Sequence, residues 1–518
     1  MKEIAILWVD DEIDLLKAHI VFLENKGYRV LTASNGIDAI KILGEHVFNL
    51  IFLDENMPGQ SGLQTLVKLK QIQPHVPVIM ITKSEEENIM DQAIGSKIAD
   101  YLIKPVNPNQ ILLTIKKHTD NQRLVSEHVS SAYQTAFRDL TGLINKAYSH
   151  KDWVEIYKTL VFWELELERS GKEINDVLRL QKTEANSEFS KFVKKHYSSW
   201  FEQTNVEKPL LSAGVMKQTV APLLQSGQKV LLIVIDNLRF DQWKSIAPMV
   251  SEYCYIEKED VYFSILPTST QYARNALFAG LMPLEIERMY PKLWVGEEDS
   301  EGKNLHEEEL LRNQTSRLHK DLKVYYEKIL NPKYARKVLD NFSNYKNNSL
   351  NVLVFNFVDA LSHARTETEV VKELVNDESS YRSITQSWFQ HSILPELLAE
   401  SVKSGMKVIL TTDHGTIKVN NPIKVIGDKA TSPNIRYKHG RNLNYNPKEV
   451  FEIRKPSEVH LPSESVTSSF IFAYNSDFMV YPNNYNHFAN FYRNTFQHGG
   501  ISMEEMIIPL ITLSSKQN

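Results

Sequence analysis

The sequence has little of what marks a secreted or membrane-spanning protein. Its 518 residues include a single cysteine, Cys254, so no intramolecular disulfide can form and a reducing compartment is favoured. No apolar run approaches the length needed to span a bilayer, and the opening residues lack the long apolar core and small-residue cleavage site of a signal peptide. These absences predict a cytoplasmic protein with no membrane span.

A basic excess is missing as well. The formal net charge is −5 at pH 7, with 59 Lys and Arg against 64 Asp and Glu. Binding to nucleic acid regardless of its sequence needs an extended basic surface, so this balance argues against it but leaves room for a local anion site. No stretch has the pattern of a basic recognition helix in a helix-turn-helix. We therefore expect no direct DNA-binding motif.

What is present is enough material for about three domains. The composition, 42% hydrophobic and 24% charged, is that of an ordinary globular protein. Residues 1–118 alternate short apolar runs such as "IAILWV" and "LIFL" with amphipathic segments, which predicts βα units around a doubly wound parallel sheet. Residues 119–205 instead show aromatic stripes at helical spacing, which indicate a helical bundle as linker domain.

Residues 206–518 return to strand-like runs. "KVLLIVID", "NVLVFNFVD" and "KVILTTD" are continuous and apolar, and each ends in an aspartate. Such runs are typical of strands that helices cover on both faces, so we predict a second α/β domain. The polar stretches 297–348 and 420–468 are expected to be excursions from it. The fold class is thus an α/β multidomain chain with a helical spacer between two α/β domains.

Polar side chains stand where the strands of the first domain end. Asp10 and Asp11 follow the first strand, Asp54 the third, Thr82 the fourth and Lys104 the fifth. Ligand sites of open parallel sheets form outside the carboxyl ends of the strands, so these side chains should converge. Carboxylates gathered in this way repel one another unless a hard cation such as Mg²⁺ neutralises them. Each residue alone is an ordinary loop residue, and only the ordered set indicates a site.

This set, with "LDENMPG" around Asp54, resembles the receiver domain of bacterial response regulators over residues 1 to about 118. The resemblance implies that Asp54 is phosphorylated. It also implies that Asp11, Asp54 and the backbone carbonyl of Asn56 bind magnesium, with Asp10 acting through bound water.

The same resemblance implies a conformational switch. Lys104 would pair with the phosphoryl oxygens, Thr82 would turn its hydroxyl toward them, and Tyr101 would follow, changing a dimerisation face. An acyl phosphate adds nearly two negative charges, which is enough to bias a bistable surface.

The second α/β domain carries acids and histidines at or just after its apolar runs. Six candidates share this placement: Asp236, Asp359, His363, Asp413, His414 and His498. His363 follows Asp359 by one helical turn, so both can face one point. Carboxylates and imidazoles around a shared centre favour zinc, and manganese suits the same mixed ligands.

These positions lie in "VIDNLRFDQW", "NFVDALSH", "TTDHGT" and "HGGIS", which resemble the alkaline phosphatase superfamily and in detail its PglZ branch. The resemblance covers about the last 310 residues. It implies one metal on Asp359, His363 and His498, and another on Asp236, Asp413 and His414 together with the nucleophile.

The nucleophile is expected in "LPTSTQYAR". Thr270 matches the superfamily position best, and Thr268 and Ser269 are the alternatives. A free threonine hydroxyl is far too weak an acid to attack at pH 7, whereas zinc lowers the pKa of a bound water to about 7 and a bound alcohol gains similarly.

The expected reaction is hydrolysis of a phosphodiester. The Cys-x-Pro-x-Arg pattern of sulfatases is missing, which argues against sulfate esters. Short or cyclic oligonucleotides are candidate substrates. Basic residues that could contact the substrate, or that could simply be solvated, are Arg239, Arg274, Arg436, Lys438, His439 and Arg441.

The order of receiver, helical spacer and PglZ-type domain is similar to the PorX-like family of response regulators, which is associated with type IX secretion. This resemblance implies a sensor histidine kinase as partner, action through a sigma factor and secretion components, and a homodimer when phosphorylated. The alternative is a non-catalytic scaffold that contains zinc and signals by phosphorylation-dependent dimerisation and binding.

Overall fold

The computed structural model describes residues 4–74, 76–83, 98–170, 176–202, 207–296, 302, 304–319, 322–428, 431–463, 465 and 467–516, without the side chains of 119–131 and 369. The chain divides into two compact units. The first comprises residues 1–134 and 170–172, and the second residues 135–169 and 173–518. The domain boundaries expected after residues 118 and 205 stay predictions. None of the described helices is long and apolar enough to cross a membrane.

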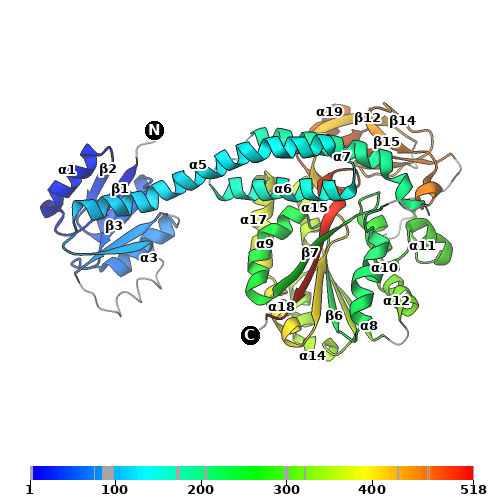
Figure 1. Ribbon diagram of the computed structural model, residues 1–518, viewed down its shortest axis with the longest axis horizontal. Helices are drawn as coiled ribbons and strands as arrows, with labels where there is room; N and C mark the ends of the chain where they lie inside the picture. Colours follow the sequence, from blue (N-terminus) through cyan, green and yellow to red (C-terminus); the bar gives the residue numbers. More distant parts are fainter. Residues whose placement is uncertain are drawn as a thin grey trace. The chain divides into compact units, whose positions relative to one another are not determined.

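The first unit contains a five-stranded parallel sheet in the order β2-β1-β3-β4-β5 (Figure 1). Its strands are β1 (Ala5–Val9), β2 (Arg29–Ala33), β3 (Leu50–Asp54), β4 (Val78–Thr82) and β5 (Asp100–Ile103). Its described helices are η1 (Ile13–Leu16), α1 (Lys17–Asn25), α2 (Gly36–Glu45), α3 (Gly62–Ile72) and the start of α5 (Pro108–Lys146).

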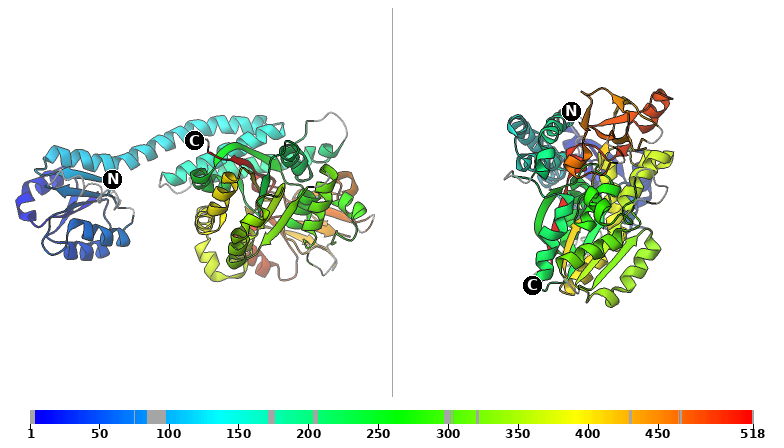
Figure 2. Two further views of the ribbon diagram at one scale, coloured as in Figure 1. Left: turned by 90° about the horizontal axis from the view of Figure 1, so that it is seen from below. Right: turned by 90° about the vertical axis from the view of Figure 1, so that its right-hand side faces the viewer.

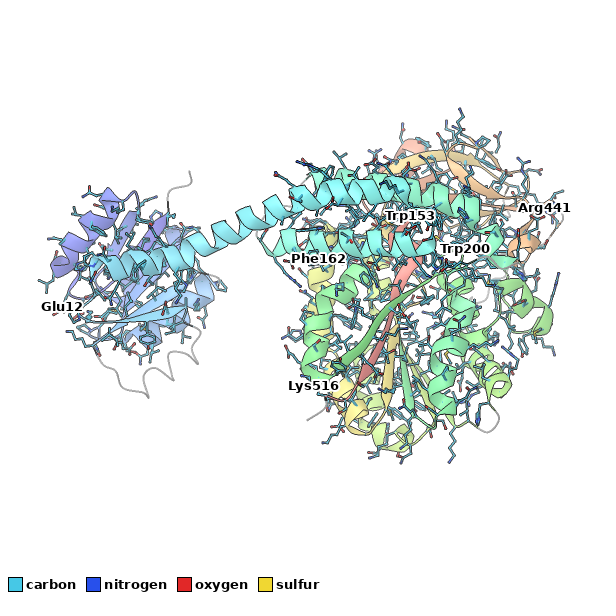
Figure 3. The ribbon with its side chains drawn as sticks, in the orientation of Figure 1. Glu12, Trp153, Phe162, Trp200, Arg441 and Lys516 are labelled. Carbon is cyan, nitrogen blue, oxygen red and sulfur yellow. The ribbon has the colours of Figure 1, made fainter. Side chains whose placement is uncertain are left out.

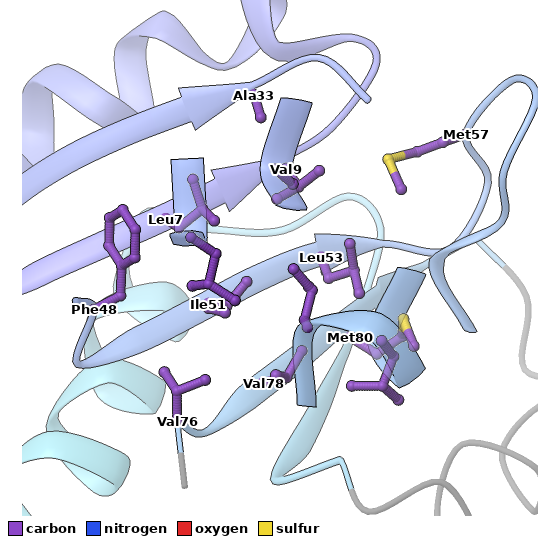
Figure 4. Packing of buried hydrophobic residues seen from close by; sticks show 14 residues of the cluster. Leu7, Val9, Ala33, Phe48, Ile51, Leu53, Met57, Val76, Val78 and Met80 are labelled. Carbon is purple, nitrogen blue, oxygen red and sulfur yellow. The ribbon is translucent and has the colours of Figure 1, made fainter. Parts of the chain in front are cut away.

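Two apolar cores cover the two faces of this sheet. Leu7, Val9, Ile51 and Leu53 point to one face, where they pack with residues of α2 and α3 (Figure 4). The alternate residues of the same strands, such as Trp8, pack on the other face with α1 and α5. Because both faces are covered, the strands carry continuous apolar runs, and the predicted doubly wound fold is confirmed.

The helical segment follows as α5, α6 (His150–Arg169) and α7 (Asp176–His196), and the two units divide within α5, between residues 134 and 135. The predicted aromatic stripe forms a core between α6 and α7. The ring of Trp153 lies 5.5 Å from that of Phe189 and 6.1 Å from that of Phe192. The predicted helical region is confirmed.

The main sheet of the second unit has six strands in the order β7-β19-β10-β6-β9-β8. They are β6 (Val230–Ile235), β7 (Tyr255–Phe263), β8 (Val324–Ile329), β9 (Leu350–Phe355), β10 (Lys407–Thr411) and β19 (Ile507–Ser514). The strands β8, β9, β6 and β10 are parallel, whereas β19 and β7 run antiparallel to their neighbours. β6, β9 and β10 are the three runs expected from the sequence.

Helices flank this sheet, and small sheets gather at one side of the unit (Figures 1 and 2). The helices are η2 (Ser198–Phe201), η3 (Ser212–Gly214), η4 (Met216–Val220), α8 (Ala221–Gln225), α9 (Phe240–Tyr253), η5 (Thr270–Arg274), α10 (Asn275–Ala279), α11 (Pro283–Met289), α12 (Glu307–Leu318), α13 (Pro332–Asp340), α14 (Phe342–Tyr345), α15 (Phe357–Glu367), α16 (Glu369–Leu374), α17 (Glu378–His391), α18 (Leu394–Lys403), η6 (Pro456–Val459), α19 (Tyr485–Tyr492) and α20 (Met503–Met506). The short strands are β11 (Ile417–Lys418), β12 (Asn421–Ile426), β13 (Tyr437–Gly440), β14 (Asn444–Tyr445), β15 (Val450–Ile453), β16 (Ser469–Ala473), β17 (Asp477–Val480) and β18 (Phe496–Gln497).

Two expectations about this unit were wrong. The stretch 297–348 is not only an excursion, because β8 within it is the edge strand of the main sheet. An edge strand is half-covered and keeps polar residues, so its sequence does not stand out from a polar loop. Asp359 does not end a strand either: β9 ends at Phe355, and Asp359 lies in the first turn of α15.

Candidate metal centres

The receiver brings three carboxylates together at the carboxyl edge of its sheet. Asp10, Asp11 and Asp54 offer oxygens that lie within 4.8 Å of one another. Asp10 and Asp54 are buried and Asp11 is exposed. The Lys104 ammonium donates to both buried carboxylates, at 2.8 Å to Asp10 Oδ2 and 2.8 Å to Asp54 Oδ2. Four of the predicted receiver residues therefore converge.

One buried carboxylate oxygen of this cluster is left without a hydrogen-bond partner in the described part of the chain and could bind a cation. Asp54 Oδ1 is buried and has no hydrogen-bond partner among the described residues. Burial raises the pKa of Asp54, and Asp10 adds to this effect while Lys104 opposes it. Burial would lower the pKa of Lys104, but its bonds to Asp10 and Asp54 raise it instead, so the lysine stays charged. A divalent cation supplies the missing partner for such oxygens.

The other predicted receiver residues surround this cluster. Asn56 is exposed in the loop that follows β3. Thr82 is the buried last residue of β4, and Tyr101 on β5 is 40% exposed. Thr82 and Tyr101 lie on neighbouring strands, where the parallel register pairs Thr82 with Ile103 and Met80 with Tyr101.

The second unit brings the six predicted acids and histidines into two triads. Within each triad the ligand atoms lie within 4.8 Å of one another. The buried triad consists of Asp236, Asp413 and His414, and the more open triad of Asp359, His363 and His498. The rings of His414 and His498 stack at 4.2 Å, so the two triads adjoin.

The residue after Asp236 connects the triads. Asn237 has φ 66°, a left-handed conformation that asparagine tolerates better than most residues. Its backbone N–H lies 3.3 Å from Asp413 Oδ1, and its side-chain amide lies 3.4 Å from Asp359 Oδ1. One asparagine thus reaches a carboxylate of each triad. Sequence reasoning missed it, although an Asp-Asn pair at the end of a buried strand is a visible signal.

The donor set fits metal ions. Asp236 Oδ1 and Asp413 Oδ2 are buried, and neither has a hydrogen-bond partner in the part of the chain that the structure describes. Burial raises the pKa of Asp236 to about 6, with Arg274 opposing the shift and Asp413 adding to it. Burial also lowers the pKa of His414 to about 4, which keeps this imidazole neutral. Buried carboxylate oxygens without hydrogen-bond partners, beside a neutral imidazole, are the ligands that zinc takes.

Backbone carbonyls orient two of the imidazoles. His414 Nδ1 lies 3.1 Å from the carbonyl oxygen of Gly415, and His498 Nδ1 lies 3.2 Å from that of Thr268. A proton on each Nδ1 satisfies these carbonyls and leaves Nε2 free to bind a metal, which is the usual arrangement around zinc.

The predicted nucleophile lies against the buried triad. Thr270 Oγ1 is 3.1 Å from His414 Nε2. The hydroxyl of Thr268 has another task, because it donates to the carbonyl of Gly500 and accepts from the N–H of Gly499. Ser269 Oγ is buried and has no hydrogen-bond partner among the residues described.

Two predicted substrate contacts bind carboxylates of the protein instead. Arg274 Nη1 lies 2.5 Å from Asp236 Oδ2, and its Nε lies 2.8 Å from Glu307 Oε1. Arg239 is completely buried and forms ion pairs with Asp241 and Glu378. The structure therefore argues against both as substrate contacts, since each guanidinium is already committed to two acids.

The charged cluster around "IRYKHGRN" also turns inward, because β13 is a fully buried strand. Arg436 binds Glu505 through Nε at 3.1 Å and Nη2 at 2.6 Å. Lys438 donates to the carbonyl of Ser432, and the His439 ring stacks on Phe470. These three residues, which were predicted to contact substrate, instead bind or stack on groups of the protein. Arg441 alone of the four is exposed (Figure 3).

Some contacts of the centre carried no sequence signal. Glu307 holds Arg274, and Asn304 donates to the backbone carbonyl of Thr270 at 3.0 Å. Both come from the polar stretch that the sequence analysis assigned to an excursion. Their partners are 33 and 34 residues away, so no local pattern links them.

Comparison with protein families covers nearly the whole chain. The model of the response regulator receiver domain matches residues 6–116, and that of the PorX response regulator linker domain matches residues 123–201. The model of the BREX system PglZ alkaline phosphatase-like domain matches residues 215–513, more than half of the chain.

Curated relatives match a smaller part. The transcriptional regulatory protein ZraR of Klebsiella oxytoca is 32% identical over 136 residues, which are 26% of this chain and 31% of that protein. The CpxR homolog of Haemophilus influenzae is 32% identical over 138 residues, 26% of this chain and 59% of that protein. Each match covers less than two thirds of the relative.

Among solved structures, a CheY-like receiver domain protein from Methanospirillum hungatei is 29% identical and covers 24% of this chain and 98% of its own, with a TM-score of 0.23. A receiver domain from Clostridium thermocellum is 30% identical, covers 23% and 98%, and has a TM-score of 0.22. The family matches agree in order with the receiver sheet, the helical segment and the unit that carries the two triads. The chain belongs to the PglZ alkaline phosphatase-like family and, with its receiver and linker, to the PorX-like response regulators.

Proposed function

We propose that phosphorylation of Asp54 in the receiver controls a zinc-dependent phosphodiesterase centre in the second unit. A receiver domain implies a sensor kinase as partner. The observation that carries the catalytic half is the contact between Thr270 Oγ1 and His414 Nε2 at 3.1 Å, next to buried carboxylate oxygens that lack partners. A purely structural metal site needs no hydroxyl nucleophile beside it.

Each triad would hold one metal. Asp236, Asp413 and His414 would share theirs with Thr270, and the second would sit among Asp359, His363 and His498. When bound, two zinc ions would lower the pKa of the attacking hydroxyl and offset the negative charge that builds up on the transferred phosphoryl group. Manganese suits the same donors.

The protein's own groups carry the displacement. Thr270 loses its hydroxyl proton to solvent, and its oxygen attacks the phosphorus of the diester. The Thr270 O–P bond forms as the bond from phosphorus to the leaving oxygen breaks, and that oxygen takes a proton from water. Water then cleaves the Thr270 O–P bond, which releases a phosphate monoester and restores the hydroxyl. Asn304 supports this residue through its bond to the Thr270 carbonyl.

The arrangement of Arg274 favours diesters over monoesters. Phosphate monoesters carry a second negative charge, and a free guanidinium is the usual partner for it. Here Asp236 and Glu307 occupy two nitrogens of Arg274. A singly charged diester makes no such demand, so nucleotide or short cyclic oligonucleotide diesters are the substrates we propose.

The receiver would act as the switch. Asp11, Asp54 and the carbonyl of Asn56 would hold a magnesium ion, which neutralises the incoming phosphoryl group. Lys104, now bound to Asp54 Oδ2, would pair with a phosphoryl oxygen after transfer. Thr82 and Tyr101 would then rearrange, promoting a homodimer. Action through a sigma factor or secretion components is part of the same proposal.

Hydrolysis of bis-p-nitrophenyl phosphate beside p-nitrophenyl phosphate tests the catalytic half. We expect the zinc-loaded protein to hydrolyse the diester faster than the monoester and Thr270→Val to lose at least about 100-fold in kcat, as removal of a nucleophile does. Ser269→Ala, which removes the rival hydroxyl, should retain activity. If neither ester is hydrolysed although zinc is bound, the scaffold alternative replaces the enzyme.

A further inference from the structure

Buried and half-buried charges join the linker helices α6 and α7 to the α/β part of the second unit. Five acids and three bases take part, and we call them the linker ion-pair cluster. Its members are Glu164, Glu168, Asp241, Glu378 and Glu504 with Lys182, Arg239 and Arg382. They come from five helices, α6, α7, α9 with its N-cap Arg239, α17 and α20, all in the same compact unit.

Arg382 on α17 joins α6 to α9. Its guanidinium is 2% exposed and donates to Glu164 Oε1 at 2.7 Å and to Glu168 Oε2 at 2.7 Å, both on α6. The same group donates to Asp241 Oδ2 on α9 at 2.9 Å. Asp241 in turn accepts from Arg239 Nε at 2.8 Å. One arginine therefore fixes α6 against the start of α9.

Two residues of α7 hold α20. Lys182 Nζ lies 2.9 Å from Glu164 Oε2 and 3.3 Å from Glu504 Oε1. Asn186 donates to Glu504 Oε2 at 2.9 Å and accepts from the Met503 N–H at 2.8 Å. The position of α20 therefore depends on α7.

From α20 the contacts continue to the histidines of both triads. Gly415 follows His414, and its N–H donates to the carbonyl of Glu505 at 3.1 Å. A Cβ on Gly415 would overlap the carbonyl oxygen of Glu504, so the two backbones pack as closely as glycine allows. The Glu505 carboxylate also accepts from the N–H of Gly500, two residues after His498.

The linker ion-pair cluster also includes a residue close in sequence to Asp236 of the buried triad. Arg239 lies three residues after Asp236, at the start of α9, and the intervening Leu238 N–H donates to Thr412 Oγ1 at 3.0 Å. The segments around His414 and His498 thus contact α20, which α7 holds. The segment after Asp236 reaches α6 through Arg239, Asp241 and Arg382.

Ion pairs of this kind set geometry more than they add stability. Taking charges out of water offsets much of their attraction, but separating one buried partner from the other is strongly unfavourable. A displacement of α6 or α7 would leave carboxylates unpaired in a cluster that already has five acids for three bases. We therefore expect α6 and α7 to pack against the α/β part in one position only. A shift away from it should break the ion pairs together.

We infer that Lys182 and Asn186, with Glu164, are positioning residues of the C-terminal metal centre, through which α6 and α7 set the backbone that carries His414 and His498. The catalytic consequence rests on the proposed function, but the consequence for metal binding does not. The helices α6 and α7 follow the receiver and α5 in the chain. A change in their position after phosphorylation would therefore alter the geometry of the metal centre.

Zinc affinity of the full-length protein, measured by competition with a chromogenic chelator, tests the inference. Lys182→Met should weaken zinc binding by about tenfold, the low end of the effect of outer groups on metal sites, and Lys182→Arg should restore most of it. Lys191→Met is the matched control on the same helix, because Lys191 is exposed and pairs only with Glu188 among the described acids. Zinc affinity of Lys182→Met equal to that of the control would overturn the inference.

Asn186→Ala keeps the test decisive if Lys182→Met fails to fold, because it removes contacts to α20 without leaving an unpaired charge. We expect weaker zinc binding and faster amide hydrogen exchange in residues 412–416 and 498–505. Wild-type affinity and exchange in this variant would contradict the inference. A wild type that binds zinc but hydrolyses no diester would remove the proposed function and leave this test standing.

Discussion

The receiver and the PglZ-type unit both gather carboxylates at the carboxyl ends of parallel strands, but they balance the charge differently. In the receiver, Lys104 is the one basic side chain among the described residues that binds the two buried acids, and the third acid, Asp11, is exposed. In the second unit, Asp236 and Asp413 are fully enclosed, and the arginine that binds Asp236 is itself held by a further buried acid.

The difference fits the two kinds of chemistry that we propose for these centres. A group that accepts a phosphoryl group from another protein must stay accessible, and a lysine, as a compact charge on a flexible stem, can shift from carboxylate to phosphoryl oxygen. A centre that stabilises a transition state benefits from groups fixed in advance. The planar guanidinium of Arg274, bound by two carboxylates, provides such a fixed group.

Removal of the basic residue should have a much larger effect on stability in the second unit, where it is Arg274, than in the receiver, where it is Lys104. Arg274→Met removes the guanidinium from the buried carboxylates of Asp236 and Glu307, so we expect the free energy of unfolding of the second unit to fall by about 3–5 kcal/mol. Lys104→Met removes a half-buried ammonium from a cluster whose third acid, Asp11, is exposed, and should lower the free energy of unfolding of the receiver by only about 1 kcal/mol.

Urea unfolding followed by hydrogen exchange and mass spectrometry reports the two units separately. Measurements without added metal ions compare the protein groups alone. Equal losses in the two variants would remove the distinction between a fixed and an adaptable centre.

The pH dependence of stability should differ between the units in the acid range. Although burial acts to raise it, Lys182 and Arg382 hold the pKa of Glu164 at about 2. A glutamate that titrates near 4.3 when unfolded then stabilises the fold above that pH, and this contribution is lost as the pH falls toward 2. The loss is on the order of 3 kcal/mol.

The contribution of Asp54 to the stability of the receiver depends on pH in the opposite direction. Burial raises its pKa, so folding disfavours its charged form. Acid should therefore remove the contribution that Glu164 makes to the stability of the second unit, and Asp54 makes no matching contribution in the receiver. Unfolding of the wild type and of Glu164→Gln, compared between pH 5 and pH 3, checks this. A pH profile that is the same in both would show that Glu164 does not contribute the difference.

The two centres also show how far sequence reasoning reaches. The acids at strand ends were predictable because a buried strand is visible as a local apolar run, and its last residue has a fixed place at the sheet edge. Asp10, Asp54, Asp236 and Asp413 all followed from this rule. His363 followed from helical spacing, since α15 brings it one turn after Asp359.

The groups around the ligands did not follow. Arg239, Arg274 and Arg436 were predicted to meet substrate, yet each binds an acid within the fold. A basic residue in a sequence does not reveal its partner when that partner lies on a distant element, as Glu307 does for Arg274. Burial decides between a substrate contact and an internal ion pair, and burial of a polar residue depends on tertiary packing rather than on a local pattern.

The central claim, that the receiver controls the second centre, is tested most directly by diester turnover with and without beryllofluoride, a mimic of the phosphoryl group on Asp54. Beryllofluoride with magnesium should change the wild-type rate at least about fivefold, the lower bound of typical coupling between sites, and should leave Asp54→Asn unchanged. A wild-type rate that is the same in both conditions, with Asp54 occupied, would contradict the account and show that the two centres act independently.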